Sequence, residues 1–320
     1  MPLCPDESRC INSETILKFC HMHLFSRPAF VSLLLLVSLL WSGPVTHHAE
    51  AGLSLSSAPP VHRPLIIAHR GGAEEFTENT IGAFTRAMSI GADGIETDLR
   101  MTRDGVVVVY HDDKFGRVEG LPKSGSAKLI SDLTYAELTA KPLPPVGADK
   151  GGQRVPTLRE LLQVSGGLLN IELKRNARFA ELVEQVMAAL KDYQGLERVE
   201  LEAPDLVTAK KLRAALGPQL RLHINPGYDE SVPYEIALKR TLEFKPHSIS
   251  VSYKKLSREI IELAHKAGVE VWVWTVDDPD IAQAMMILGV DAIKTDIPTR
   301  LLALRNQQSH NHRPASTPRK

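Results

Sequence analysis

Residues 65–98, LIIAHRGGAEEFTENTIGAFTRAMSIGADGIETD, carry the pattern that decides the fold. The stretch opens with a short apolar run and then passes through Thr80 into a segment whose apolar residues recur every three or four positions up to Gly91. This pattern predicts a strand, then a helix that Thr80 caps and Gly91 ends, and then a second strand over 93–98. The stretch is therefore expected to form a strand–helix–strand unit.

The same alternation of apolar runs and amphipathic segments continues to about residue 305. Thr157 and Glu160 form a capping-box pattern, which predicts a helix that ends near Gly166. Further helices are predicted over 178–191, 205–216, 233–243, 257–267 and 278–288, and further strands over 106–110, 168–173, 199–201, 220–224, 248–251, 269–274 and 292–294.

The spacing of the nine predicted strands indicates how they connect. Only residues 101–105 separate the second strand from the third, whereas a parallel crossover needs a dozen or more residues. The third strand must then pair with the second as a hairpin. Eight strands in strand–helix order over roughly 240 residues predict an α/β fold, a closed (β/α)8 TIM barrel, with a doubly wound sheet as the alternative. Residues 112–155, rich in Gly, Pro and Lys, are expected to form a small insertion after the hairpin.

The N-terminal region predicts export. The uncharged apolar run 30–41 is shorter than the about 20 residues needed to cross a bilayer, and a small-x-small cleavage site, Ala49-Glu50-Ala51, follows it. We expect a signal peptide that is cleaved near Ala51, a periplasmic or secreted protein, and no stable membrane span after cleavage. Met22 offers an alternative start.

Composition narrows the possible partners and sources of stability. The chain has 38 basic and 38 acidic residues, so net charge gives no reason to expect nucleic acid as a partner. Its three cysteines, at positions 4, 10 and 20, all precede the predicted cleavage site, so a disulfide framework is excluded for the mature protein. We expect 1–51 to be the signal region, 52–63 a flexible lead-in, 64–305 the barrel domain and 306–320 a disordered tail.

Charged residues and a histidine stand at the carboxyl ends of the predicted strands, which is where a barrel of this kind builds its active site. Residues two apart on a strand share one face, so the side chains within each pair below are expected to point the same way. The residues are His69 and Arg70 after the first strand, Glu96 and Asp98 on the second, and Glu172 and Lys174 on the fourth.

These residue types indicate phosphate chemistry that depends on a metal. Glu96, Asp98 and Glu172 would repel one another without a cation, and their oxygens suit one divalent ion, Ca²⁺ or Mg²⁺, better than zinc. Arg70 and Lys174 supply positive charge for a phosphate group.

Other residues complete the predicted site. His69 and His111 can take a proton from an attacking oxygen and give one to a leaving oxygen. The alternation of Trp272 and Trp274 is expected to turn one ring inward, and Trp274 at the mouth would wall a glycerol or choline group. Asn79 is expected to cap a helix together with Thr80, with a secondary role for both in ordering the loop at His69. The aspartate at 296 is expected to fix the last loop, and the histidines at 223, 247 and 265 are expected to be structural.

At these same positions the chain resembles the glycerophosphodiester phosphodiesterase family. The resemblance extends in order from residue 65 to about 300. The matching blocks are HRGG at 69–72, ENT at 78–80, GADGIETD at 91–98, TRDG at 102–105, HD at 111–112, VPTL at 155–158, NIELK at 170–174, VWTV at 273–276 and TD at 295–296.

The resemblance implies a barrel enzyme that hydrolyses small glycerophosphodiesters such as glycerophosphocholine to an alcohol and sn-glycerol 3-phosphate. It places the metal on Glu96, Asp98 and Glu172, with His69 as general base and His111 as general acid. A mechanism consistent with the family has the glycerol 2-hydroxyl attack phosphorus, giving a cyclic phosphate that water then opens.

Two segments depart from the family pattern. Residues 201–204 read LEAP where a Ser-Phe pair is common, and 115–120 lacks the usual Arg-Thr-Thr-Gly run, which leaves Arg117 without an assigned role. The alternatives are a phospholipase D-like or sphingomyelinase D-like lipase that acts on lysolipids, and an inactive phosphodiester-binding relative. Few large apolar residues in the insertion favour soluble substrates, and no expected catalytic residue is missing.

Overall fold

The computed structural model describes residues 63–120, 128–228 and 230–311. The predicted signal peptide, the predicted lead-in up to residue 62 and the last nine positions of the predicted tail lie outside these ranges. The tail was expected to begin at 306, but α10 (Pro298–Asn311) includes 306–311. Polar composition does not by itself end a helix, and neither Gly nor Pro, the residues least compatible with a helix interior, occurs between 306 and 311.

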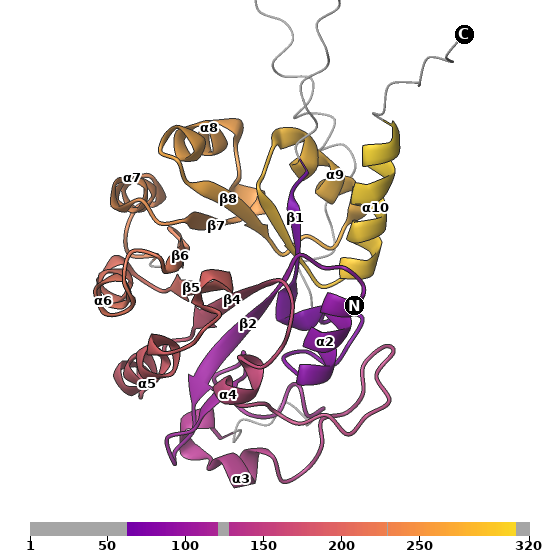
Figure 1. Ribbon diagram of the computed structural model, residues 1–320, viewed down its shortest axis with the longest axis vertical. Coiled ribbons are helices and arrows are strands. Elements are labelled where there is room, and N and C mark those ends of the chain that lie inside the picture. The colour runs from indigo at the N-terminus through magenta and orange to yellow at the C-terminus, as the bar shows by residue number, and fades with distance from the viewer. Residues whose placement is uncertain (1–62, 121–127, 229, 312–320) are drawn as a thin grey trace, which may run out of the picture. The chain divides into compact units, whose positions relative to one another are not determined.

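Eight parallel strands close into a barrel (Figure 1). Around the barrel the order is β1, β9, β8, β7, β6, β5, β4, β2, and pairing of β1 with β2 closes the ring. β3 pairs antiparallel with β2, so the predicted barrel and the predicted hairpin are both confirmed. The strands are β1 (Leu65–Ala68), β2 (Gly94–Met101), β3 (Val107–Val109), β4 (Leu168–Leu173), β5 (Val199–Ala203), β6 (Arg221–Ile224), β7 (Ser248–Ser252), β8 (Glu270–Trp274) and β9 (Ala292–Thr295).

Helices pack around the outside of the barrel (Figure 1). They are α2 (Ile81–Ser89), α3 (Tyr135–Leu138), α4 (Leu158–Leu161), α5 (Phe179–Lys191), α6 (Leu206–Leu216), α7 (Tyr234–Phe244), α8 (Arg258–Lys266), α9 (Pro279–Leu288) and α10, with short 3-10 turns η2 (His69–Gly71), η3 (Ile130–Asp132), η4 (Leu196–Arg198) and η5 (Tyr253–Lys255).

Local signals set the ends of these helices. Thr80 accepts a hydrogen bond from the Ala83 amide, and Thr157 and Glu160 form both halves of a capping box, as predicted. The helix that Thr157 opens ends at Leu161 rather than near Gly166. There the chain turns so that Gly166, at φ 87°, lies against α2.

The packed core lies between the helices and the outer face of the barrel. Phe84 of α2, Leu182 of α5 and Leu212 of α6 are fully buried in one cluster with strand residues such as Leu99. The residues that point into the barrel are more polar. Because the strands are parallel and in register, Asp98, Glu172, Glu202 and His223 occupy successive positions across β2, β4, β5 and β6. A row of ionisable side chains therefore crosses the barrel interior.

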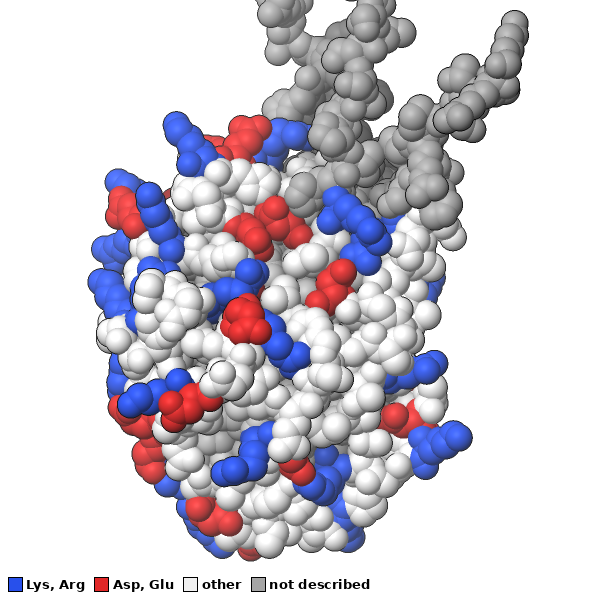
Figure 2. Space-filling model, in the orientation of Figure 1, with Lys and Arg blue, Asp and Glu red and all other residues white. Residues whose placement is uncertain are grey.

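None of the helices within residues 63–120, 128–228 and 230–311 is long and apolar enough to cross a membrane. On the face drawn in Figure 2, acidic and basic side chains are interspersed, in keeping with the equal numbers of the two in the sequence.

Candidate active site

A cavity of about 260 Å³ opens at the carboxyl ends of the barrel strands. All the predicted site residues except Asp98 line this cavity: His69, Arg70, Glu96, His111, Glu172, Lys174 and Trp274. Asp98 is 1% exposed, and its Oδ1 lies 3.1 Å from Lys174 Nζ. The predicted residues are thus brought together in one place, as expected for the carboxyl ends of parallel strands.

Three carboxylates form a cluster that can hold one metal ion. One oxygen each from Glu96, Asp98 and Glu172 lies within 4.8 Å of the other two. Asp98 Oδ1 is buried and accepts no hydrogen bond of good geometry from the described residues, and the ammonium of Lys174, 3.1 Å away, is the positive charge beside it. An all-oxygen donor set is what Mg²⁺ and Ca²⁺ prefer, and the residues therefore fit such an ion.

The two acids next to Lys174 respond differently to burial. Burial and the neighbouring Glu202 raise the pKa of Glu172 to about 7. Burial also works to raise the pKa of Asp98, but Lys174, His111 and Arg70 outweigh it and hold that pKa well below its usual range. Lys174 Nζ lies 2.7 Å from Glu172 Oε1 and bridges the two acids. Crowding of like charges at this point is what a bound cation would relieve.

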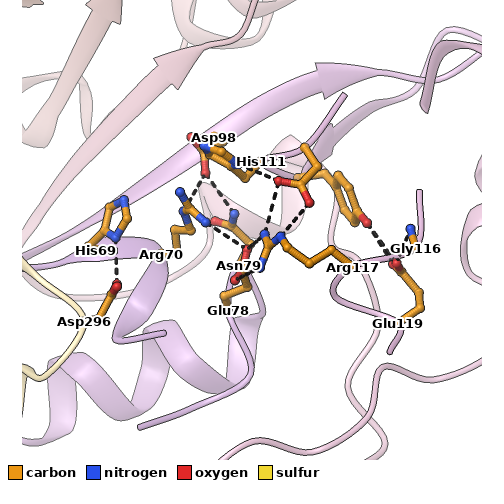
Figure 3. A network of polar contacts seen from close by, with 12 residues as sticks. His69, Arg70, Glu78, Asn79, Asp98, His111, Gly116, Arg117, Glu119 and Asp296 are labelled. Carbon is orange, nitrogen blue, oxygen red and sulfur yellow. Dashed lines mark hydrogen bonds and ion pairs between the residues drawn. The ribbon is translucent and has the colours of Figure 1, made fainter. Parts of the chain in front are cut away.

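His69 is held in a fixed orientation by Asp296, which was expected only to fix the last loop. His69 Nδ1 lies 2.7 Å from Asp296 Oδ1 (Figure 3). The other ring nitrogen, Nε2, lies 3.8 Å from Glu96 Oε2. Burial lowers the pKa of His69, but Glu96 and Asp296 raise it by more. With the Nδ1 proton donated to Asp296, the other ring nitrogen, Nε2, is left to exchange a proton at the cavity.

Arg70 reaches the cluster from an unusual backbone conformation. Its φ of 51° lies in the left-handed region, which is uncommon for a residue with a side chain. The Arg70 amide donates to Glu96 Oε2 at 3.1 Å, Nη1 donates to Glu78 Oε1 at 3.3 Å, and Nε lies 3.6 Å from Asp98 Oδ2. The strained turn therefore places the guanidinium beside the carboxylates.

A second set of contacts holds His111, and it gives Arg117 a place (Figure 3). His111 Nδ1 lies 2.7 Å from Asp112 Oδ1, and Arg117 Nε donates to Asp112 Oδ2 at 2.6 Å. Arg117 also donates through Nη1 and Nη2 to both oxygens of Glu78, at 2.8 and 2.6 Å. Since Glu78 accepts from Arg70 as well, Arg117 connects the acid behind His111 to the acid behind Arg70.

Two expectations about neighbouring residues need correction. Asn79 does not cap α2, because Thr80 does so; instead Asn79 Nδ2 donates to Asp98 Oδ2 at 3.0 Å and its Oδ1 accepts from Thr97. Trp272 and Trp274 both point into the barrel, since residues two apart on a strand share a face. Trp272 is fully buried against His223, with ring centroids 4.9 Å apart, and Trp274 lines the cavity.

The three histidines expected to be structural pair with polar groups other than Glu96, Asp98 and Glu172. His223 is fully buried and bonds the hydroxyl of Ser248, and its Nε2 lies 3.5 Å from Glu202 Oε2. His247 lies 3.2 Å from Glu270 and His265 lies 2.7 Å from Asp291.

The departure at 201–204 puts a charged residue into the cavity. Glu202 is 4% exposed, lines the cavity and accepts from the Lys294 ammonium at 2.7 Å. Burial lowers the pKa of Lys294 and raises that of Glu202, but the attraction between them reverses both effects. Both groups are therefore charged. This pair was not predictable from local sequence patterns, because the two residues are 92 positions apart.

Comparisons with known proteins agree on one family. Residues 69–300 match the glycerophosphoryl diester phosphodiesterase family. The glycerophosphodiester phosphodiesterase of Caldanaerobacter subterraneus is 32% identical over 247 residues, which cover 76% of this chain and 98% of the relative. Human lysophospholipase D is 28% identical over 276 residues, which cover 73% of this chain and 84% of that relative. The crystal structure of glycerophosphodiester phosphodiesterase from Thermotoga maritima superposes with a TM-score of 0.61 at 26% identity. The superposition covers 76% of this chain and 99% of that structure.

Proposed function

The chain belongs to the glycerophosphoryl diester phosphodiesterase family, and from that membership and the geometry of the cavity we propose that it hydrolyses glycerophosphodiesters to an alcohol and sn-glycerol 3-phosphate. One observation carries the proposal. Three clustered carboxylates, two cationic side chains and two histidines, each histidine held by an aspartate, lie at or directly beside one cavity of the barrel. This is the set of groups that phosphodiester cleavage by acid and base requires.

The proposed cofactor is one divalent ion, Ca²⁺ or Mg²⁺, held by Glu96, Asp98 and Glu172. A bound ion of this kind would stabilise negative charge on the phosphoryl oxygens. Asn79 helps to prepare the site, because its hydrogen bond to Oδ2 fixes the orientation of the Asp98 carboxylate, whose Oδ1 faces Lys174 and would be shared with the ion. Lys174 compensates part of the acid charge of the cluster.

Proton transfer is assigned to the two histidines. His69 acts through Nε2 as the base that takes the proton from the glycerol 2-hydroxyl as its oxygen bonds to phosphorus. His111 gives a proton to the oxygen of the departing alcohol as the P–O bond breaks. In the second step water opens the cyclic phosphate, and the two histidines exchange roles. Asp296 and Asp112 stabilise the histidines when they are protonated.

Arg70 and Lys174 are assigned to the phosphate. The Arg70 guanidinium can donate to two oxygens of one phosphate group, and the left-handed turn at this residue directs it toward the cluster. Trp274 lines the same cavity and offers an apolar wall to the carbon skeleton of the substrate.

The proposed place of action is outside the cytoplasm. The apolar run 30–41 and the cleavage site at 49–51 support export to a periplasm or secretion. The lining of the cavity by charged and polar side chains supports a soluble diester over a lysolipid as substrate. The presence of both histidines and all three carboxylates supports an active enzyme over an inactive relative.

Hydrolysis of glycerophosphocholine, with and without EDTA, tests this function. Wild-type protein with Ca²⁺ or Mg²⁺ should release choline, and EDTA, His69→Ala and Glu96→Ala should each reduce the rate by at least about a hundredfold. His265→Ala is the matched control, because His265 also pairs with an aspartate at 2.7 Å but lies outside the cavity. Turnover that survives EDTA and both site substitutions would contradict the proposed mechanism.

A further inference from the structure

A buried ion pair crosses the barrel at the cavity. Lys294 is on β9 and Glu202 is on β5, and in the closed ring these strands lie opposite each other, with three strands between them on either side. The two side chains meet at 2.7 Å and are 4% and 6% exposed. Since both also line the cavity, the pair forms its floor.

The pair is not needed to balance the charges of the metal and the phosphate. It adds one positive and one negative charge, so it leaves the net charge of the cluster unchanged. Burying such a pair costs free energy, and apolar residues of similar size are often at least as stabilising. A role in stability alone therefore does not account for an ion pair at this position, whereas recognition of a polar ligand would.

The chemistry of the floor is complementary to a hydroxyl group. An ammonium carries three N–H donors, and only one is directed at Glu202 Oε2. The carboxylate retains acceptor capacity on its second oxygen, while the register places Glu202 beside Glu172 of the carboxylate cluster. A hydroxyl can accept from Lys294 and donate to Glu202 at the same time. Neither an acyl chain nor a trimethylammonium group can do both.

The exposure of the two histidines indicates which half of the diester reaches the floor. The His69 side chain is 14% exposed and that of His111 is 31% exposed. The group that His111 protonates on departure therefore faces the open side, and the glycerol half, which His69 deprotonates, lies deeper. Ser250 and Asn225 line the same cavity and add polar groups to it.

We propose that Glu202 and Lys294 bind the terminal hydroxyl of the glycerol unit, and that they restrict the enzyme to diesters whose glycerol carries no acyl chain. This inference rests on the proposed function and names its substrate class. It assigns to the pair a role in specificity, because an ester at the terminal oxygen could not donate to Glu202. The bulk of an acyl chain would also meet a charged floor.

The test compares glycerophosphocholine with its deoxy analogue, which keeps the 2-hydroxyl and the diester but has a methyl group in place of the terminal CH₂OH. Wild-type kcat/KM for the analogue should be lower by about tenfold to a hundredfold, as expected for a lost hydrogen bond to charged groups. Lysophosphatidylcholine acylated at the terminal oxygen should be poorer still. In the double variant Glu202→Gln/Lys294→Met, kcat/KM for glycerophosphocholine should exceed that for the deoxy analogue by about threefold or less.

A matched control removes another partly buried ion pair. Asp93 and Arg305 pair at the opposite, amino end of the barrel, outside the cavity, so Asp93→Asn/Arg305→Met should keep the full preference. Equal rates on glycerophosphocholine and the deoxy analogue by wild-type protein, or equal rates on the lysolipid, would overturn the inference and leave the proposed function standing. A Glu202→Gln/Lys294→Met enzyme that keeps the full preference would overturn the inference as well, and Glu202→Gln alone, which keeps the size of the side chain, takes the place of the double variant if that protein does not fold. Absence of turnover on every glycerophosphodiester would overturn both.

Discussion

Asp296→Asn removes the charge behind the proposed base and changes almost nothing else in shape. Asp296 accepts the Nδ1 proton of His69 at 2.7 Å, and that bond leaves Nε2 unprotonated on the side of the cavity. An asparagine can instead donate its NH₂ to Nδ1, and the proton then sits on Nε2. His69 in that tautomer cannot act as a base.

The size of the effect follows from comparable carboxylate–histidine pairs. The same change in a serine protease triad costs about 10⁴ in kcat, through the wrong tautomer and the lost stabilisation of the imidazolium. Asp296 is 21% exposed, so water can replace part of its stabilising charge. We therefore expect kcat to fall by roughly a hundredfold to a thousandfold.

The pH profile provides a second readout of the same substitution. Burial lowers the pKa of His69, and Glu96 and Asp296 together raise it above its ordinary value. The base must be neutral, so kcat/KM is lost as the pH falls through the pKa of His69. Without the Asp296 charge that pKa decreases, and the acidic limb of the profile should move to lower pH.

Both effects can be measured by following choline release from glycerophosphocholine between pH 5 and 9. Asp291→Asn is the matched control, because Asp291 also lies 2.7 Å from a histidine ring nitrogen, on His265, outside the cavity. An Asp296→Asn enzyme with wild-type kcat and an unmoved acidic limb would refute the assignment of His69 as an oriented base.

Three further outcomes are expected. Arg117→Lys keeps the positive charge but cannot bind Asp112 and Glu78 at the same time, so kcat should fall by about tenfold. Arg103→Lys, at another exposed ion pair, is the control and should leave kcat unchanged. An Arg117→Lys enzyme with wild-type kcat would refute the positioning role of Arg117. Since the pKa of Glu172 is about 7, the affinity for Ca²⁺ or Mg²⁺ should fall by up to about tenfold for each pH unit below 7, because the ion must displace the proton of this carboxyl group. Calorimetry should also detect the released proton through its uptake by the buffer. An affinity that does not depend on pH would contradict this expectation. Gly71→Ala should lower the free energy of unfolding in urea by at least about 1–2 kcal/mol, because φ is 86° and a Cβ would meet Ala83 at 2.7 Å; an unchanged midpoint would count against that strain.

The fold was predictable because it depends on local signals repeated along the chain. The caps at Thr80 and Thr157 and the short connection 101–105 are readable from neighbouring residues, and together they specify the barrel and its hairpin. The end of α4 was not predictable in this way. The helix stops at Leu161, five residues before Gly166, and no Gly or Pro stands there to mark its end.

The site was predictable to the extent that it follows from strand ends. Glu96 and Glu172 stand where parallel strands converge, so their proximity follows from the topology. The partners that orient the site do not follow from it, because contacts over long separations leave no local pattern. Asp296 and His69 are 227 positions apart in the sequence, and Arg117 and Glu78 are 39 positions apart. The expectation that only one of Trp272 and Trp274 points into the barrel was wrong for a simple reason. Residues two apart on a strand lie on the same face, so both side chains point inward.

Phosphorus NMR of the products tests most directly the claim that this cavity cleaves the diester on the side of the alcohol. Glycerophosphocholine incubated with wild-type protein and Ca²⁺ or Mg²⁺ should give glycerol 3-phosphate as the phosphorus-containing product. The proposed attack by the glycerol 2-hydroxyl keeps phosphorus on the glycerol throughout, and His111→Ala should slow the appearance of that signal by about a hundredfold or more. Choline phosphate as the product, or an unchanged signal of the starting diester, would contradict the account.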